Sequence, residues 1–414
     1  MSEKYSKYEL INPGWLTEEF IQKILRNSEK DETIKVLSLD IAPATLNNDH
    51  YGSVMYRTKI EYKNSKNENI TLSLIVKTMP EHDSIKKDML EGTFIFKTEI
   101  RMYSETIPKM EAILRKYGDD TVLGAKVYYA SMEPHNVLIF EDLVVKGYST
   151  LQNRTPNEEE VKRALMKIAK WHAVSHILAK EEPEMITNYN DGIFTIDMEK
   201  IEMFTTAIPN FINHTLSSDE ELKKYIPLFE NLKETLLPRC ADIWNYYKRG
   251  QKAIYVLNHG DFHFKNMMFK HKESGELDDL MLVDFQTCYY GPSATDIMYS
   301  TYMLMDGDTR WNRRDEMIYY YFQIFIDCLK KFDYKGEIPK MVDLQIDLIK
   351  CRALETCMLV TFLPFVACFN DNSIAMDDIV ESPDYRSKVF ANPVVVEEVK
   401  RTLPRYLHRG NLEL

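Results

Sequence analysis

The sequence lacks the cysteine pattern of a disulfide-rich or zinc-binding protein. Its 414 residues include six cysteines, and none of them forms a C-x-x-C pair. A chain of this length can bury a large core without a disulfide or metal to stabilise it, and at about 150 residues per domain it predicts two to three folding units. We therefore expect six reduced, buried thiols: Cys240, Cys288, Cys328, Cys351, Cys357 and Cys368.

An excess of positive charge is also missing. The chain has 52 Lys and Arg against 64 Asp and Glu, which gives a net charge of −12. Sequence-independent binding of nucleic acid depends on neutralising phosphates, so an acidic chain is a poor candidate for it. We therefore expect no nucleic-acid partner, although a local basic pocket for a small phosphate ligand remains compatible with this charge.

Long apolar runs are absent as well. The most apolar stretch, residues 358–369, is too short to span a bilayer and contains Pro364. Residues 1–7 lead into no apolar segment of signal-peptide length. With 44% apolar and 28% charged residues, the composition is that of an ordinary globular protein. We expect a soluble, cytoplasmic protein without a membrane partner.

Two kinds of periodicity divide the chain. Alternating patterns predict strands at 34–41, 54–62, 70–77, 125–131 and 136–140, with one helix over 93–117. From residue 155 the spacing becomes helical, with Thr155 as the expected N-cap and Pro156 as the first helical residue. Further helices are expected at about 198–214, 219–250, 309–332 and 339–362, with one hairpin of 266–270 and 280–286. This predicts an α+β protein with two lobes that join near 141–147.

One polar segment carries the strongest chemical signal. Residues 259–266 read HGDFHFKN, and residues 280–286 read LMLVDFQ. Phosphoryl transfer from ATP needs a carboxylate that orients and deprotonates the attacking hydroxyl, and an Asn and a second carboxylate that hold Mg²⁺. An Asp-x-x-x-x-Asn loop, followed by a strand that ends in Asp, supplies such oxygen ligands from two sides of one cleft. Gly260 lets the backbone turn tightly beside Asp261.

These motifs resemble the phosphotransferase signature of the aminoglycoside and choline kinase group, which shares the protein-kinase-like fold. Within that group the chain is most similar to the ecdysteroid-kinase-like (CHK kinase-like) family, over about residues 30–400 and with the motifs in the family's order. The other matching motifs are Phe96-x-x-Glu99-x-x-x-Tyr103-x-x-x-x-Pro108, Glu141-Asp142-Leu143, His172-Ala173-x-Ser175 and Gly291-Pro292-x-x-x-Asp296-Ile297.

The resemblance implies that two parts of the chain have different functions. Residues 1–143 would form a small antiparallel-sheet N-lobe that binds ATP. Residues 144–414 would form a large, mostly helical C-lobe with the catalytic loop and the substrate pocket. By the same resemblance, Asp261 is the catalytic base, and Asn266 and Asp284 are the Mg²⁺ ligands.

The resemblance also implies the residues that hold ATP. Lys77 would contact the α- and β-phosphates, and Glu99 would fix Lys77, because a flexible ammonium needs an acidic partner to stay directed at phosphate. The backbone of a hinge that includes Glu141 and Leu143 would bind the adenine edge. The phosphate-covering loop, residues 44–53, departs from the family because Gly52, next to Ser53, is its only glycine.

The acceptor is expected to be a small molecule with a hydroxyl group. Only 12 residues separate Asp284 from Asp296, and no Ala-Pro-Glu follows, so the chain has no room for the peptide platform of a protein kinase. The family resemblance favours an ecdysteroid or another lipophilic alcohol, including a xenobiotic, while the composition also fits a cationic acceptor. The hydroxyl that is phosphorylated and the oligomeric state stay open. Candidate lining residues are Tyr299, Tyr302, Met303, Met305, Trp311, Met358 and Phe362.

The motifs allow two other interpretations. His259-x-Asp261-x-His263 and His172-x-x-x-His176 could bind zinc in a hydrolase, but no Glu lies between the latter pair, and Asn266 and Asp284 would have no role. A degenerate kinase could bind nucleotide without transferring phosphate, which the glycine-poor loop favours and the intact motifs oppose. We prefer the kinase, with His259 and Asp296 as structural residues of its catalytic loop.

Overall fold

The computed structural model describes residues 11–44, 53–79, 93–152, 154–195, 201–369 and 383–413. Its contacts divide the chain into two compact units. The sheet unit comprises the described residues of Met1–Lys109, Val122–Ser149 and Met281–Gln286, and the helical unit comprises those of Met110–Thr121, Thr150–Leu280 and Thr287–Leu414. The assignment of ATP binding to 1–143 and of catalysis to 144–414 stays a prediction.

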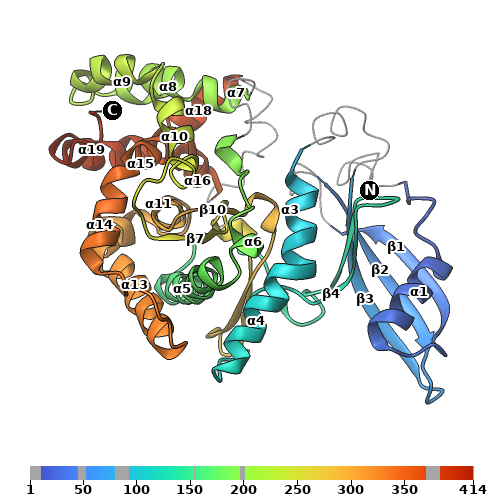
Figure 1. Cartoon of the computed structure of the whole chain (residues 1–414). Helices are drawn as coiled ribbons and strands as arrows, with labels where there is room; N and C mark the ends of the chain where they lie inside the picture. Colours follow the sequence, from blue (N-terminus) through green and yellow to red (C-terminus); the bar gives the residue numbers. More distant parts are fainter. Residues whose placement is uncertain are drawn as a thin grey trace. The chain divides into compact units, whose positions relative to one another are not determined.

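The sheet unit is built on five antiparallel strands (Figure 1). Alternating buried and exposed side chains along Val54–Lys63 place its apolar face on the core, as the sequence pattern predicts. β-Branched and aromatic residues suit such a half-buried, pleated surface. In spatial order the strands are β1 (Lys35–Pro43), β2 (Val54–Lys63), β3 (Asn69–Thr78), β5 (Val137–Glu141) and β4 (Val127–Ser131).

A helix that the sequence analysis did not predict, α1 (Glu18–Glu29), lies against this sheet (Figure 1). Thr17 caps it by accepting a hydrogen bond from the Phe20 amide at 3.2 Å. Its buried Ile21, Ile24 and Leu25 join the strand side chains in one apolar cluster. The apolar side of α1 therefore covers apolar side chains of the sheet.

The helix expected at 93–117 is present but interrupted. It consists of α3 (Ile95–Arg101), a π-helical turn η1 (Met102–Thr106) and α4 (Ile107–Lys116). Pro108 has no amide hydrogen with which to continue the helical ladder, and the wide turn directly precedes it. Within this segment the Tyr103 ring packs against Phe140 of β5, with centroids 4.7 Å apart. This contact fixes α3, which carries Glu99, on the sheet unit.

The longest helix of the helical unit, α5 (Glu158–Glu181), begins two residues later than expected. Asn157, not Thr155, is the N-cap, and its side chain accepts a hydrogen bond from the Glu160 amide at 3.0 Å. The Glu160 carboxylate returns the bond by accepting from the Asn157 amide at 2.8 Å. This reciprocal capping box satisfies two amides at once, so Thr155 and Pro156 remain outside the helix.

Among the remaining helices of this unit, α13 packs directly beside α5 (Figure 1). The helices expected at 198–214, 219–250, 309–332 and 339–362 are each broken into shorter pieces. In chain order, the described α-helices that follow α5 are α6 (Pro183–Ile186), α7 (Glu202–Thr205), α8 (Ala207–Asn210), α9 (Ile226–Leu232), α10 (Leu236–Trp244), α11 (Ala294–Met303), α12 (Gly307–Asn312), α13 (Arg314–Lys331), α14 (Met341–Lys350), α15 (Arg352–Cys357), α16 (Leu363–Phe369), α18 (Pro383–Phe390) and α19 (Pro393–His408).

Short strands also occur in the helical unit and around it. The expected hairpin is present as β8 (Met267–His271) and β9 (Leu277–Leu282), and a two-residue strand, β6 (Tyr148–Ser149), ends the Val122–Ser149 segment of the sheet unit. The prediction of a single interruption is wrong, because β7 (Tyr255–Asn258) pairs antiparallel with β10 (Tyr289–Pro292). In sequence, these two strands lie on either side of the segment that contains the HGDFHFKN motif, residues 259–266.

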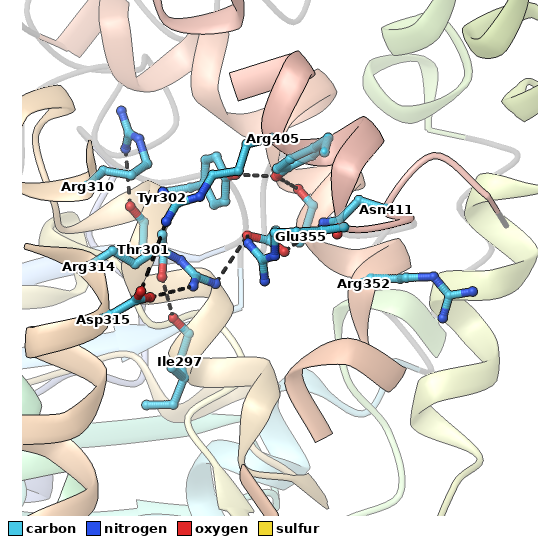
Figure 2. Close-up of polar contacts among 12 residues, drawn as sticks. Ile297, Thr301, Tyr302, Arg310, Arg314, Asp315, Arg352, Glu355, Arg405 and Asn411 are labelled. Carbon is cyan, nitrogen blue, oxygen red and sulfur yellow. Dashed lines mark hydrogen bonds and ion pairs between the residues drawn. The ribbon is translucent and has the colours of Figure 1, made fainter. Parts of the chain in front are cut away.

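A buried polar network connects the last residues of the chain to the rest of the helical unit (Figure 2). The Glu355 carboxylate accepts from Arg314 at 3.1 Å and from Asn411 at 2.7 Å. Tyr406 donates to the Glu355 carbonyl at 3.1 Å and also contacts the Tyr302 hydroxyl. The cost of burying the Arg314–Glu355 ion pair is therefore offset by further hydrogen bonds to Glu355, as buried ion pairs require.

The expected state of the cysteines is confirmed where their side chains are described. Cys240, Cys288, Cys328, Cys351 and Cys357 are free and buried. Across the described ranges, no helix combines the length and apolar character that a membrane crossing would need.

Candidate active site

Three of the predicted nucleotide-site residues meet in the sheet unit. Lys77, near the end of β3, places its Nζ 2.6 Å from Glu99 Oε2 and 2.7 Å from Asp284 Oδ1. Glu99 is on α3, and Asp284 follows β9. The Lys77 and Glu99 side chains are 7% and 2% exposed, whereas that of Asp284 is 25% exposed. The predicted pairing of Lys77 with Glu99 is therefore present, and Asp284 completes it.

The electrostatics of this triad keep the lysine charged. Burial lowers the pKa of the Lys77 ammonium, but attraction to Asp284 and Glu99 outweighs it and raises the pKa above its usual range. Burial raises the pKa of Glu99, and attraction to Lys77 offsets this only in part. A charged ammonium with one partly exposed carboxylate beside it is suited to phosphate oxygens.

The backbone of Asp284 is in the left-handed region, with φ of 67°. Asp tolerates this conformation better than most residues, but it still marks a position that its surroundings hold in place. The next residue, Phe285, is fully buried, with its ring centroid 5.0 Å from that of Tyr103. Gln286 Nε2 donates to Asp284 Oδ2 at 3.1 Å. Together these contacts fix the direction of the carboxylate.

In the helical unit, the structure brings Asp261 and Asn266 together. Asn266 Nδ2 donates to the Asp261 carbonyl at 3.1 Å and to Asp261 Oδ2 at 3.0 Å. Both bonds use the amide nitrogen, which leaves the amide oxygen as the atom able to bind a cation. Carboxylate and amide oxygens are the ligands that Mg²⁺ prefers, so Asn266 and Asp284 fit that ion chemically.

Asp296, at the start of α11, holds the backbone of the loop that begins at His259. Its carboxylate accepts from the His259 amide at 2.7 Å and from the Gly260 amide at 3.0 Å. His172 Nε2 lies 3.1 Å from the same carboxylate, and His172 Nδ1 lies 2.7 Å from the Tyr321 hydroxyl. The predicted structural role of Asp296 is thereby confirmed, and its connection to His172 was not foreseen.

Gly260 is required by the geometry of this loop. Its φ is 83°, and a Cβ atom would lie 2.1 Å from the Thr287 carbonyl oxygen. Any side chain at this position would force the two segments apart. The close approach keeps Gly260, the residue before Asp261, in contact with Thr287, two residues before β10 begins.

Sequence reasoning missed one contact of Asp261. His263 Nε2 lies 3.2 Å from Asp261 Oδ2, whereas the motif had suggested His263 only as a zinc ligand. Burial raises the pKa of the Asp261 carboxyl, but His263, with smaller contributions from His259 and Tyr299, outweighs this and lowers it below its usual range. Asp261 is therefore ionised at neutral pH and acts as a hydrogen-bond acceptor.

The expected adenine hinge is tied into local structure. The Glu141 amide donates to the Lys126 carbonyl at 2.9 Å, and the Leu143 carbonyl accepts from Lys146 at 3.0 Å and Tyr148 at 3.1 Å. The role of Glu141 and Leu143 in binding adenine stays a prediction. Ser53 is buried at the start of the β2 segment, and Gly52 lies outside the described residues.

Between the two hinge residues, Asp142 has a structural role that the sequence analysis did not foresee. Its Oδ2 accepts from Arg57 Nε and from Ser73 Oγ, each at 2.7 Å. The Val144 amide donates to its Oδ1 at 3.1 Å. Asp142 therefore ties the end of β5 to β2 and β3.

The candidate substrate-lining residues are mostly interior. Of the seven, all except Trp311 are at most 8% exposed, and the Tyr302 hydroxyl contacts Tyr406. They belong to the packed core of the helical unit, and their contact with an acceptor stays a prediction.

The residues of the zinc alternative have other partners. Both ring nitrogens of His172 are engaged, as described above, and His176 Nδ1 lies 2.8 Å from the Tyr255 carbonyl. Among the residues that the structure places, no three His, Cys, Asp or Glu side chains are grouped as metal ligands. The two histidines on α5 are structural.

Comparisons with known proteins agree with the resemblance seen in the motifs. The model of the ecdysteroid kinase-like family matches residues 47–334. The comparison with curated proteins found no match.

Solved structures with similar folds include three kinases. A Plasmodium vivax ethanolamine kinase has 12% identity over 92% of this chain and 89% of its own, with a TM-score of 0.38. An amicoumacin kinase in complex with AMP-PNP, Ca²⁺ and Ami has 14% identity over 92% of this chain and 96% of its own, with a TM-score of 0.35. The choline kinase LicA from Streptococcus pneumoniae has 14% identity over 90% and 98%, with a TM-score of 0.35.

Because these TM-scores are low, the assignment depends on the family match and on the fold itself. The expected fold class, α+β with a small antiparallel sheet and a mostly helical remainder, is confirmed. The family match covers well over half of the chain. The chain belongs to the ecdysteroid kinase-like family, a family of small-molecule kinases.

Proposed function

We propose that the protein transfers the γ-phosphate of ATP to a hydroxyl group of a small lipophilic alcohol, such as an ecdysteroid or a xenobiotic. The observation that carries this proposal is the ion-paired Lys77, whose ammonium is within 2.7 Å of both Glu99 and Asp284. A buried lysine held between two carboxylates, one of them partly exposed, matches what nucleotide phosphates and their metal ion require.

Each charged group then has a role in the reaction. Lys77 binds the α- and β-phosphates, and Glu99 keeps its ammonium in place. Asp261 orients the acceptor hydroxyl through its ionised carboxylate and takes up the proton as the phosphoryl group is transferred. Asn266 contributes its amide oxygen to the metal site while its amide nitrogen holds Asp261.

Asn266 and Asp284 would hold Mg²⁺, which when bound neutralises charge on the phosphates. The chain's own contribution is to orient these oxygens. Gln286 and Lys77 each hold one oxygen of the Asp284 carboxylate, and Asp261 fixes the Asn266 amide. The predicted hinge and the Gly52–Ser53 turn would bind adenine and phosphate.

Family membership supports a small-molecule acceptor. The short segment between Asp284 and Asp296, which leaves no room for a peptide platform, supports it independently. The similar solved structures include kinases of ethanolamine and choline, which are amino alcohols. We favour a lipophilic alcohol because the family is ecdysteroid kinase-like.

The test is phosphate transfer from γ-labelled ATP with Mg²⁺ to a panel of an ecdysteroid, a sterol, a long-chain alcohol, choline and ethanolamine. The parent should label at least one lipophilic alcohol. Asp261→Ala should lower transfer by a factor of about 10² to 10⁴, because it removes the group that orients the hydroxyl. ATP affinity, measured by calorimetry, should change little, since Lys77 and the metal ligands remain.

Glu273→Ala, in the exposed turn after β8, is the matched control and should retain full activity. Equal labelling by the parent and Asp261→Ala would refute the role of Asp261. Binding of ATP without transfer to any alcohol would instead identify a nucleotide-binding protein, the alternative that the glycine-poor 44–53 segment favours.

A further inference from the structure

His263 contacts the catalytic carboxylate although the proposed reaction assigns it no role. It is two residues after Asp261, and its Nε2 lies 3.2 Å from Asp261 Oδ2. Asn266 Nδ2 donates to the same oxygen at 3.0 Å. The His263 side chain is 17% exposed and that of Asp261 is 20% exposed, so the pair is at the edge of the interior.

A second hydrogen bond determines which ring nitrogen of His263 carries the proton. The Lys265 amide donates to His263 Nδ1 at 3.1 Å. A backbone N–H is always a donor, so Nδ1 must offer a lone pair, and the proton of the neutral ring is then on Nε2. The nitrogen that faces Asp261 is therefore a donor.

We propose that His263 is a positioning residue for the acceptor-binding carboxylate, an inference that rests on the proposed kinase function. Nδ2–H of Asn266 donates to Asp261 Oδ2, and Nε2 of His263 lies at ion-pair distance from the same oxygen, so that the two side chains together restrict rotation of the carboxylate. Oδ1 is then the oxygen that takes the acceptor hydroxyl. Such restraint lowers the loss of freedom on reaching the reactive geometry, which affects kcat more than ATP binding.

A purely structural role for His263 makes a different prediction. His263 precedes a short 3₁₀ turn, η7 (Phe264–Asn266), and its Nδ1 caps that turn by accepting from Lys265. If this cap were its whole contribution, loss of Nδ1 would matter and loss of Nε2 would not. The two ring nitrogens can be separated by substitution.

His263→Asn and His263→Gln are the matched pair. Asparagine places an acceptor near the position of Nδ1 and is a good cap, but it is too short to reach Asp261. Glutamine places an amide nitrogen near the position of Nε2 and can still donate to Asp261. We expect His263→Asn to keep its melting temperature and its KM for ATP, while kcat falls by a factor of about 10 to 100.

His263→Gln should keep kcat within about threefold of the parent even where its melting temperature falls, because the donor to Asp261 is retained. The reverse pattern, an active His263→Asn and an inactive or unstable His263→Gln, would overturn the proposal. Glu273→Ala again serves as the control.

A spectroscopic measurement separates this inference from the proposed function. In protein with ¹⁵N-labelled histidine, the His263 signals, assigned through His263→Asn, should show a protonated Nε2 and an unprotonated Nδ1. Asp261→Ala should shift the Nε2–H signal. A protonated Nδ1 on a neutral ring would overturn the contact without any activity assay. A parent protein that transfers no phosphate would overturn the proposed function, and with it the catalytic role of the contact between His263 and Asp261.

Discussion

Lys77 and Asp296 are buried charges that each have several partners. Lys77 lies between two carboxylates, and the Asp296 carboxylate accepts two amides and faces His172. Removing one partner of a buried charge typically costs 3–5 kcal/mol, so these arrangements are hard to alter singly. Because a buried charge that loses its partners is unfavourable, these contacts favour one geometry of the loop and one position of the Lys77 ammonium.

Asp347 of α14 is a buried carboxylate with weaker compensation. It accepts a hydrogen bond from the Ile254 amide at 2.7 Å, and burial raises its pKa to about 6. In the unfolded chain an aspartate ionises near pH 3.9. Its stabilising contribution is therefore complete below about pH 4 and is lost as the pH rises through about 6.

We predict that Asp347→Asn becomes more stable relative to the parent as the pH rises from 4 to 7, because the amide keeps an acceptor and carries no charge. The raised pKa sets an upper limit of about 3 kcal/mol for the change. Urea unfolding at several pH values measures it. Glu337→Gln, at an exposed position, should show a flat difference, and a flat difference for Asp347→Asn would contradict the account.

Among the helices and strands, those with a local sequence signal are the ones that could be predicted. The five strands of the sheet unit lie within two residues of their predicted bounds, because alternation along each strand reports its buried face. The strands β7 and β10 were missed because each has four residues and their pairing joins positions about thirty residues apart. α1 was missed although Thr17, Ile21 and Ile24 do carry a capping and spacing signal.

In the candidate site, too, local motifs predicted some residues, and only the fold revealed the others. The order of the motifs identified Lys77, Glu99, Asp261, Asn266 and Asp284 through the family resemblance. The contacts of Lys77 within the sheet unit, and of Asp261 with Asn266, then required the fold. His263 and Asp142 could not be assigned from the sequence, because their roles come from the side chains that they meet.

The start of α5 provides a test of an element boundary. Asn157→Ala should lower the free energy of unfolding by about 1–2 kcal/mol, because it breaks the reciprocal bonds with Glu160. Thr155→Ala should change it by less than about 0.5 kcal/mol, since Thr155 is outside the helix. Denaturant unfolding of both variants decides between the two caps, and a larger loss for Thr155→Ala would restore the sequence prediction.

At the scale of the whole molecule, the two units contribute different groups to the proposed reaction. The sheet unit holds Lys77, Glu99 and Asp284, and the helical unit holds Asp261 and Asn266. The family match spans residues of both units. A ligand that binds only the folded protein stabilises it by an amount that grows with the logarithm of the ratio of free ligand concentration to the dissociation constant.

We therefore predict that ATP raises the melting temperature by several degrees with Mg²⁺ and by less with EDTA. At about 100 times the dissociation constant, binding contributes about 2.7 kcal/mol. Asp284→Asn should lose most of the part that depends on Mg²⁺, because it removes a charged ligand. Glu273→Ala should retain it. An equal rise in EDTA, or in Asp284→Asn, would contradict the proposed metal site.

The most direct test of the central claim is a crystal structure with AMP-PNP and Mn²⁺, in which anomalous scattering locates the metal. The account predicts an ion bound by the Asn266 amide oxygen and the Asp284 carboxylate, at about 2.0–2.3 Å, between them and the nucleotide phosphates. Lys77 should contact the phosphates, and Asp261 should face the γ-phosphate. A metal ion bound without either Asn266 or Asp284, or a nucleotide bound away from Lys77, would contradict it.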